Sequence, residues 1–374
     1  MKAKNKNIAK IDPQIIENRR ERPIVSIVIP AYNEEEIIEK NLSAIVNYME
    51  SIEKKYPWEI VVVDDGSIDE TGKLADEYAA SRKNIHVLHH FTNFQLGQAL
   101  RYAFSNCQGD YIVVMDLDLS YSPKHIEKLL DAIQETRAKI VIASPYMKGG
   151  KITNVPLLRR ILSVWANRFL GLTAKGKIST ITGMVRAYDR EFISNLNTKA
   201  MDMGINPEII YKAQLLRARI KEIPAHLDWS AQNEVGKKRR SSMKIMWSIL
   251  SSLFSGFIFR PFMFFILPGF FSLLLALYPI IWTFIHTFTY LGQIPSSSGS
   301  FDYRLSDAIS LAFNQAPHAF FIGGIALMVG LQLISLGVLA LQSKRYFEES
   351  FHLSSAIYKY IKTNKNRYEE NSKL

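Results

Sequence analysis

Residues 111–118 read Tyr-Ile-Val-Val-Met-Asp-Leu-Asp, an apolar run rich in β-branched side chains that ends in two carboxylates. Such a run predicts a buried strand of a parallel sheet, with Asp116 and Asp118 at its C-terminal end. Side chains two residues apart in an extended chain point to the same side, roughly 6.5 Å apart, so both acids can bind one hard cation. Because Asp-x-Asp is also common in surface loops, the prediction of a metal and diphosphate site depends on its surroundings.

Short strand-like runs recur on both sides of this segment. They are rich in Val and Ile, helical patterns separate most of them, and they lie at Ile24–Ile29, Glu59–Val63, Ile85–Leu88 and Lys139–Ala143. Strands that alternate with helices predict an α/β fold with a doubly wound, mostly parallel sheet. Ligands of such sheets bind beyond the C-terminal ends of the strands, so we expect a site in the loops there.

One helix is defined in detail by its apolar periodicity. Its apolar residues fall on one face, at Ile38, Leu42, Ile45, Met49 and Ile52. Asn33 and Glu36 lie just before this pattern, and we expect them to cap the N-terminus of the helix.

Two more loops at predicted strand ends carry acidic side chains. Pro30-Ala31-Tyr32-Asn33-Glu34 follows the first strand, and Asp64-Asp65-Gly66-Ser67 follows the second. A nucleotide needs an aromatic or apolar wall for its base and acids for the base edge and the ribose hydroxyls, and these loops offer both. A helix cap and a tight Asp-Gly turn explain either loop alone. Three acid-bearing turns at strand ends favour a nucleotide site instead.

Two long apolar runs near the C-terminus predict membrane-spanning helices. They cover 261–288 and 319–342, and neither contains Asp, Glu, Lys or Arg. Each exceeds the roughly 20 residues that cross a hydrocarbon layer about 30 Å thick. A buried hairpin in a water-soluble core is the alternative, but helices of such cores rarely stay uncharged on all faces over this length.

Basic residues flank the two apolar runs on their outer sides. They precede the first run and follow the second, at Lys237, Lys238, Arg239, Arg240, Lys244, Arg260, Lys344, Arg345, Lys359, Lys362 and Lys365. The segment between the runs has only Arg304 as a basic residue. By the positive-inside rule, we expect an integral protein of the cytoplasmic membrane with both termini and the N-terminal domain in the cytoplasm.

The formal net charge is +11, and much of this excess lies beside the two apolar runs. Many of these basic residues lie where side chains meet anionic lipid headgroups, so no nucleic-acid partner is expected. Met243–Phe259 mixes apolar residues with serines, which fits either an interfacial helix on the membrane or a linker helix packed on the N-terminal domain. The single cysteine, Cys107, excludes an intramolecular disulfide, and no apolar run follows the basic N-terminus, so no cleaved signal peptide is expected.

Three segments resemble the signature segments of family 2 glycosyltransferases with a GT-A type fold. They are VSIVIPAYNEEE (Val25–Glu36), VVVDDGSIDET (Val61–Thr71) and VVMDLDLSYSP (Val113–Pro123). Further segments resemble the polyisoprenyl-phosphate glycosyltransferase and dolichyl-phosphate mannosyltransferase branch: 159–167, Thr182-Gly183, Arg186-Ala187-Tyr188, Glu208 and Ile220–Pro224. Together with the C-terminal hairpin, the resemblance covers residues 24–345.

The resemblance and the apolar pattern together divide the chain into five expected parts. These are a basic extension at 1–23, a cytoplasmic GT-A catalytic domain at 24–242, an interfacial juxtamembrane helix at 243–260, a transmembrane hairpin at 261–342 and a basic cytoplasmic tail at 343–374. The aromatic-rich spans would also allow a homo-oligomer, although no feature of the sequence gives its size.

The resemblance implies transfer of a sugar from a UDP- or GDP-linked donor to a polyisoprenyl phosphate lipid, with inversion at the anomeric carbon. The attacking group would be a phosphate oxygen, which is largely ionised at neutral pH because its second pKa is about 6, so no strong general base is needed. The departing nucleoside diphosphate gains negative charge. It therefore calls for a divalent cation and for Arg or Lys donors.

The resemblance also implies which residues bind the donor. Four residues would line the nucleoside: Pro30, Tyr32, Glu34 and Asp65. Asp116 and Asp118 would hold Mg²⁺ or Mn²⁺ against the diphosphate, and oxygen ligands suit either ion.

Basic residues further along match the segments that contact phosphate groups. Arg159, Arg160 and Ser163, on a helix predicted to begin near Pro156, match the family segment that contacts the acceptor phosphate. Arg186 is a further candidate for a catalytic phosphate clamp. For each arginine, a solvated charge or a charge that faces lipid headgroups is the alternative.

The chain departs from the family pattern at four places. Ser120 stands where many relatives have Gln as a third metal contact, and Pro145 stands where close relatives often carry Arg. The loop Ser179–Arg186 is one residue longer than usual, and Asn93–Gly97 has fewer glycines. These differences put one metal contact and one phosphate contact in doubt.

Two other functions share part of this pattern. A processive polysaccharide synthase has the Asp-x-Asp and the nucleotide loops, but it typically also needs a Gln-x-x-Arg-Trp segment, whereas Gln214–Arg217 is followed by Ala218. Two spans are also too few for a polymer channel without partners. A non-catalytic, membrane-tethered nucleotide-binding scaffold would explain the departures near Pro145 and Ile181, but the acids at strand ends argue against it.

Overall fold

The computed structural model describes residues 22–157, 160, 161, 163, 164, 167, 178–230 and 261–372. The chain divides into two compact units, one made of Met1–Ser255 with His352–Leu374 and the other of Gly256–Phe351. The predicted interfacial helix at 243–260 and all but two residues of the predicted extension at 1–23 lie outside the described residues.

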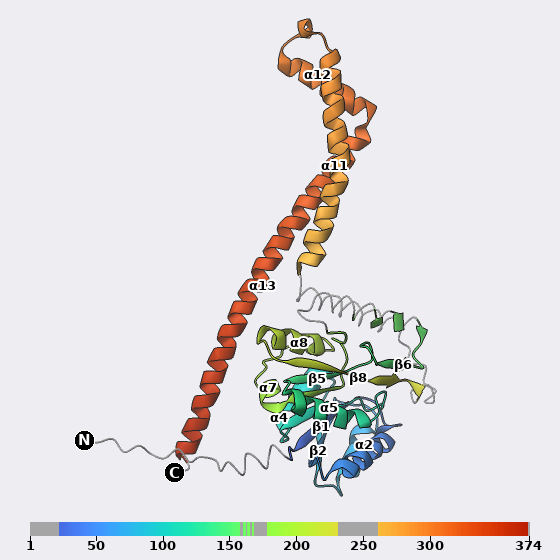
Figure 1. The fold of residues 1–374 in the computed structure, drawn as a ribbon, viewed down its shortest axis with the longest axis vertical. Helices are drawn as coiled ribbons and strands as arrows, with labels where there is room; N and C mark the ends of the chain where they lie inside the picture. Colours follow the sequence, from blue (N-terminus) through green and yellow to red (C-terminus); the bar gives the residue numbers. More distant parts are fainter. Residues whose placement is uncertain are drawn as a thin grey trace, which may run out of the picture. The chain divides into compact units, whose positions relative to one another are not determined.

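The first unit is built on a β-sheet (Figure 1). This sheet has seven strands in the order β3-β2-β1-β4-β7-β5-β8. The strands are β1 (Val25–Ala31), β2 (Trp58–Asp64), β3 (Ile85–His89), β4 (Tyr111–Val114), β5 (Ile140–Ser144), β7 (Arg186–Asp189) and β8 (Ile220–Pro224). Neighbouring strands are parallel except that β7 runs antiparallel to β4 and β5. β6 (Lys151–Thr153) and β9 (His226–Asp228) form a separate parallel pair. The predicted α/β fold with a mostly parallel sheet is confirmed.

The five predicted strands correspond to β1 to β5, each within two residues of its predicted bounds. The sequence pattern does not predict β7, because this strand has only four residues and begins and ends with Arg186 and Asp189. Its place between β4 and β5 is therefore set by long-range pairing and not by a local apolar run.

Helices cover both faces of the sheet. On one face, α2 (Ile38–Ile52) and α5 (Lys124–Thr136) share an apolar core with alternate residues of β1 and β2. On the other face, Phe104 packs against Tyr188 of β7 with ring centroids 5.6 Å apart. Among residues 22–157 and 178–230, the other helices with defined bounds are α3 (Thr71–Ala79), α4 (Leu96–Asn106), α7 (Arg190–Ser194) and α8 (Ile205–Leu215).

The apolar face predicted for α2 is confirmed, but its predicted cap is wrong. Ile38, Leu42, Ile45 and Met49 are fully buried. The helix begins at Ile38, and no side chain caps it. Asn33 instead bonds to the neighbouring loop, because a turn in which Ile37 and Ile38 both donate to the Glu34 carbonyl at 3.1 Å precedes the helix.

Two apolar helices, one within the second unit and one that begins in it, could form a membrane hairpin. α11 (Pro261–Gln293) and α13 (Pro317–Ser372) contain the predicted spans at 261–288 and 319–342. Their segments Phe264–Gln293 and Pro317–Ser354 each reach a mean hydropathy of 2.2 and are long enough to cross a membrane. A short turn, η1 (Ser296–Ser298), and a helix that the sequence pattern does not predict, α12 (Phe301–Gln315), connect them.

Small residues allow α11 and α13 to approach closely. A Cβ atom added at Gly269 would lie 3.0 Å from the Gly330 carbonyl oxygen, and one at Gly337 would lie 2.4 Å from Ile266. Ser272 Oγ donates to the Ala326 carbonyl at 2.7 Å. Contacts through glycine and serine are typical of helices that pack within a lipid bilayer.

We expect Leu42→Ala to lower the free energy of unfolding of the sheet unit by about 2–5 kcal/mol, because it empties a fully buried position of the core. Unfolding of the detergent-solubilised protein can be followed by the fluorescence of its five tryptophans, one of which, Trp58, is buried in β2. Lys40→Ala, an exposed position of the same helix, should change the value by less than about 0.5 kcal/mol. Equal losses in both variants would contradict the packing described for α2.

Candidate active site

Three loops meet at one edge of the sheet because β2, β1 and β4 are adjacent and parallel. β1 ends at Ala31, which pairs with Asp64 at the end of β2, and β4 ends at Val114, which pairs with Val28. Neighbouring strands lie about 4.8 Å apart, so the residues that follow these ends share one edge. The structure therefore places at this edge the predicted nucleoside-binding and metal-binding residues: Pro30, Tyr32, Glu34, Asp65, Asp116 and Asp118.

The two acids after β4 project from a firmly held turn. Asp116 and Asp118 are half-buried, whereas Leu117 between them is 2% exposed. Asp118 Oδ1 accepts a hydrogen bond from the Ser120 backbone N–H at 3.0 Å. Leu119 has a left-handed φ of 51°, so the chain turns directly after the second acid. The alternation buries the apolar side chain and turns both carboxylates away from the core.

Tyr121 lies beside these acids, although sequence reasoning did not single it out. It is 6% exposed, and its backbone forms an antiparallel bridge with Leu227. Burial, and next the negative charge of Asp116, raise the pKa of Tyr121. Its hydroxyl therefore stays protonated at neutral pH. The only local signal was a tyrosine three residues after the Asp-x-Asp segment.

Asp116 and Asp118 suit a Mg²⁺ or Mn²⁺ ion in number and kind. Mg²⁺ is usually held by one or two carboxylates together with water and substrate phosphate oxygens. Among the described residues, no group of three or more His, Cys, Asp or Glu side chains is arranged to hold a metal. An ion at this pair would need further oxygen ligands besides the two carboxylates.

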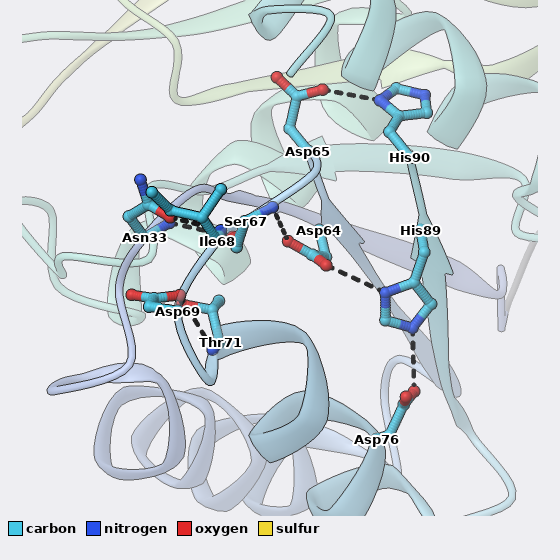
Figure 2. Close-up of polar contacts among 10 residues, drawn as sticks. All are labelled: Asn33, Asp64, Asp65, Ser67, Ile68, Asp69, Thr71, Asp76, His89 and His90. Carbon is cyan, nitrogen blue, oxygen red and sulfur yellow. Dashed lines mark hydrogen bonds and ion pairs between the residues drawn. The ribbon is translucent and has the colours of Figure 1, made fainter. Parts of the chain in front are cut away.

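The loops after β1 and β2 are joined by reciprocal hydrogen bonds (Figure 2). The Asn33 backbone N–H donates to Ser67 Oγ at 3.0 Å, and Asn33 Oδ1 accepts from the Ile68 backbone N–H at 2.9 Å. The Glu34 N–H donates to Thr71 Oγ1 at 2.7 Å. The φ of 53° at Asn33 is one that asparagine tolerates better than most residues. These bonds make the two loops one rigid wall of the site.

Asp65 is the most tightly held of the predicted nucleoside-binding residues. It is 4% exposed, and its backbone N–H donates to the Ala31 carbonyl at 2.9 Å. Its Oδ1 atom accepts from His90 Nδ1 at 2.7 Å and from the Phe94 backbone N–H at 3.0 Å. Tyr32, by contrast, is 43% exposed. Tyr32 directly follows Ala31, which accepts the Asp65 N–H bond, so the two loops offer an exposed ring and a fixed acid, a combination suited to a flat base with polar edges.

Asp64 makes a second set of contacts in which it serves the fold. Its Oδ1 accepts from the Ser67 N–H at 3.0 Å, and its Oδ2 lies 3.0 Å from His89 Nδ1. His89 Nε2 in turn lies 3.1 Å from Asp76 Oδ1 of α3 (Figure 2). A Cβ at Gly72 would lie 2.5 Å from Asp64 Oδ2, so this position has no room for a side chain.

The predicted acceptor-binding residues are only partly described. Arg159 lies outside the described residues. Arg160 is exposed, and its backbone N–H donates to the Pro156 carbonyl at 2.9 Å, as expected in the first turn of a helix. Ser163 is half-buried and its hydroxyl bonds to the Tyr146 hydroxyl. Tyr146 directly follows the Pro145 departure, so a hydroxyl pair lies next to the place where an arginine was expected.

Two polar side chains, the buried Asn167 and the half-buried Glu222, hold the loop before β7. Asn167, 2% exposed, accepts from the Ile181 N–H at 2.9 Å through its Oδ1 atom. Glu222 accepts from the backbone N–H groups of Ser179 at 2.9 Å and Thr180 at 2.8 Å. Sequence reasoning gave no role to these two contacts, because each joins segments far apart in the chain.

Arg186, the predicted phosphate clamp, lies in β7 and is fully buried. Its guanidinium donates to the carbonyls of Ile181 and Asn206, the latter at 3.1 Å. Burial lowers the pKa of Arg186. These contacts join the preceding loop to α8 and give the side chain a structural role, while a catalytic role stays a prediction.

Comparison with known proteins decides the family. Residues 26–196 match the model described as glycosyl transferase family 2. An undecaprenyl-phosphate mannosyltransferase of Micrococcus luteus is 30% identical over 224 residues, which cover 58% of this chain and 87% of that protein. This chain belongs to glycosyl transferase family 2. The resemblance seen in the sequence is thereby confirmed.

Two further relatives match a smaller share of their own length. The dolichol-phosphate mannosyltransferase of Pyrococcus furiosus is 33% identical over 213 residues, 56% of this chain and 58% of that protein. The polyprenol monophosphomannose synthase of Mycolicibacterium smegmatis is 37% identical over 180 residues, 47% of this chain and 65% of that protein. The chain thus spans less than two thirds of each of these two relatives. All three acid-bearing loops lie within the segment that matches family 2.

The contacts of His89 predict a pH dependence of stability. Burial opposes its protonation, but the hydrogen bonds to Asp64 and Asp76 outweigh burial, so the pKa of His89 is raised. A histidine whose pKa is raised on folding stabilises the fold at pH values below its unfolded pKa of about 6.5. This contribution is lost as the pH rises through the pKa of the folded state. We expect the melting temperature of wild type to fall more between about pH 6 and pH 8 than that of His89→Gln. Parallel pH profiles of the two proteins would contradict this contribution.

Proposed function

We propose that this family 2 chain is an inverting glycosyltransferase that moves a sugar from a UDP- or GDP-linked donor to a polyisoprenyl phosphate. One observation carries the proposal: the loops after β1, β2 and β4 bring their acids to a single edge of the sheet. Ligands of such sheets bind at this edge. The names of three relatives, all polyprenyl-phosphate or dolichol-phosphate sugar transferases, support the acceptor class.

In this proposal the loops after β1 and β2 bind the nucleoside. Asp65 accepts hydrogen bonds from the base edge, since its carboxylate is buried and oriented by two donors. Tyr32 and Pro30 offer a wall for the base, and Glu34 lies on the same loop within reach of ribose hydroxyls. The rigid link between the two loops keeps the groups in place before the donor arrives, which lowers the cost of ordering them.

Asp116 and Asp118 would hold Mg²⁺ or Mn²⁺ against the donor diphosphate. The ion supplies positive charge where negative charge grows as the nucleoside diphosphate departs. The two carboxylates would hold this ion, and through it they would orient the diphosphate, while the buried Leu117 lies between them in the chain. Ser120 is 5% exposed, and its backbone N–H donates to Asp118. Because its side chain is short, a third protein contact to the ion from this position would be weaker than one from a longer side chain.

The acceptor supplies the nucleophile in this reaction. An ionised phosphate oxygen of the lipid forms a bond to the anomeric carbon while the bond from that carbon to the diphosphate breaks, which inverts its configuration. Because the phosphate monoester is already ionised at neutral pH, no protein base has to remove a proton. Arg160, exposed at the start of its helix, is proposed to bind this phosphate, with Arg159 and Ser163 nearby in sequence.

The apolar helices fit an enzyme whose acceptor is a membrane lipid. We propose that α11 and α13 anchor the chain in the cytoplasmic membrane, with the catalytic domain and both termini in the cytoplasm, because the basic residues lie outside the two spans. A homo-oligomer through these helices stays a prediction.

Transfer of label to lipid tests the proposal directly. The full-length protein would be incubated with a panel of UDP- and GDP-sugars, a short polyisoprenyl phosphate, and Mg²⁺ or Mn²⁺, and the lipid fraction would be analysed by mass spectrometry. We expect a product that carries one sugar for each lipid phosphate. A polymer would instead indicate a processive synthase, and no transfer from any donor would indicate a scaffold.

We expect Asp116→Asn and Asp118→Asn each to lower kcat at least about 100-fold, because either change weakens binding of the metal ion that assists departure of the diphosphate. Initial rates at saturating donor and acceptor, with and without EDTA, provide the measurement. Glu77→Gln, at an exposed position of α3, should keep the wild-type rate within about twofold. Near-normal turnover in either aspartate variant would contradict the proposal that this aspartate binds the metal ion.

We expect Arg160→Ala to raise the KM for polyisoprenyl phosphate about tenfold, because a charge-assisted hydrogen bond to the phosphate is lost. The dissociation constant of the nucleoside diphosphate, measured by titration, should change less than about twofold. Lys128→Ala removes an exposed positive charge from α5 and serves as the control. Equal losses of donor and acceptor binding in Arg160→Ala would argue against an acceptor site.

A further inference from the structure

Two aspartate–histidine pairs occupy consecutive positions where β2 and β3 end (Figure 2). Asp64 and His89 are partners in the register of these parallel strands, and their side chains meet at 3.0 Å. One residue further along both chains, Asp65 Oδ1 and His90 Nδ1 lie 2.7 Å apart. Because successive side chains of an extended chain alternate, the two pairs lie on opposite faces of the sheet.

The two pairs have different neighbours. On one face, His89 also bonds to Asp76 of α3 and Asp64 also accepts from the Ser67 N–H, so that pair connects elements of the fold. On the other face, His90 contacts α4 through Tyr102, and its partner Asp65 is the acid proposed to bind the nucleoside. Only in the second pair, therefore, is the aspartate itself a residue proposed to bind the donor.

His90 is held in one orientation by two aromatic rings. Its side chain is 9% exposed. The imidazole stacks on Tyr102 with centroids 5.2 Å apart and planes inclined by 22°, and it meets Phe94 nearly perpendicularly at 5.1 Å. Packing on these two sides fixes the plane of the ring, and with it the direction in which Nδ1 points.

We infer that His90 is a positioning residue that aims the Asp65 carboxylate at the base of the donor. The inference rests on the proposed function, in which Asp65 binds the nucleoside. A carboxylate oxygen is an acceptor, so Nδ1 carries the proton of this bond. The His90 Nδ1–H and the Phe94 N–H, at 3.0 Å, both end on Oδ1.

This arrangement leaves the other carboxylate oxygen, Oδ2, directed away from His90 (Figure 2). Oδ2 of Asp65 is then the atom that accepts from a base N–H, a group that uracil and guanine both present on their pairing edge. Because the carboxylate is already oriented, it loses little freedom when the nucleotide binds. Without the His90 bond, Asp65 keeps its charge but loses one of the two donors that orient it.

Nucleotide affinity of the full-length protein tests the inference. UDP and GDP, each with Mg²⁺, would be titrated into wild type, Asp65→Asn, His90→Asn, His90→Gln and the double variants with Asp65→Asn. Asparagine carries its amide nitrogen as far along the side chain as Nδ1, whereas glutamine carries it one atom further, as Nε2. We expect His90→Gln to weaken binding of the preferred diphosphate about tenfold and His90→Asn to weaken it by less than about threefold.

A double-mutant cycle separates positioning from general damage. In the Asp65→Asn background, His90→Gln should change the affinity by less than about twofold, because the carboxylate that it orients is gone. In the transfer assay, His90→Gln should raise the KM for the donor and leave kcat within about twofold. Where binding to Asp65→Asn is too weak to measure, the difference between His90→Asn and His90→Gln decides the outcome.

His89→Gln is the matched control. It removes a comparable bond to a neighbouring aspartate on the opposite face, and it should leave the affinity for UDP and GDP within about twofold. Thermal unfolding of every variant identifies losses that come from the fold. Equal losses in His90→Asn and His90→Gln, or an undiminished loss in the Asp65→Asn background, would overturn the inference.

The experiment also separates this inference from the proposed function. If Asp65→Asn weakens nucleotide binding and His90→Gln does not, the role of His90 fails and the nucleotide site stands. If Asp65→Asn leaves the affinity for both diphosphates unchanged, the nucleotide role of Asp65 fails, and the inference about His90 fails with it.

Discussion

The parallel pairing of β2, β1 and β4 is the constraint on which the candidate site depends. Backbone hydrogen bonds align Ala31 with Asp64 and Val28 with Val114, and the acid-bearing loops begin at these ends. Side chains alternate along a strand, so a shift of one residue between β4 and β1 would turn Asp116 and Asp118 to the opposite face. The buried side chains of the three strands oppose such a shift, because it would expose the core that α2 and α5 cover. Site geometry and core packing are thus two results of the same register.

Polar side chains complete what the register begins. The loops after β1 and β2 are joined to each other, and the loop before β7 is held by Asn167 and Glu222. Backbone N–H groups donate nearly all of these bonds, and these groups would otherwise need water in a partly buried place. The walls of the site are therefore set before any ligand binds. The buried Arg186 belongs to this framework, since its partners are backbone carbonyls.

The sequence allowed much of this unit to be predicted, and the failures have a common cause. Strands β1 to β5 and the acids that follow them are local patterns of apolar runs and Asp-rich turns, so they can be read from single segments. β7, the partners of Asn33 and the burial of Arg186 depend on segments far apart in the chain, which no local pattern reports. The doublets Asp64-Asp65 and His89-His90 were a signal of paired strand ends that could have been noticed. The roles of Arg159 and the segment 243–260 stay predictions.

The left-handed turn at Leu119 has a consequence for how this protein balances stability against function. A residue with a branched side chain at a φ of 51° costs about 1–2 kcal/mol relative to an ordinary backbone conformation. The turn nevertheless persists, because Leu117 is buried before it and the Ser120 N–H is bonded to Asp118. The favourable contacts of the rest of the domain therefore offset the cost of the turn that holds the second acid in place. A more relaxed turn would make a sturdier protein with a less well-defined acidic pair, which is the compromise expected where geometry is under selection.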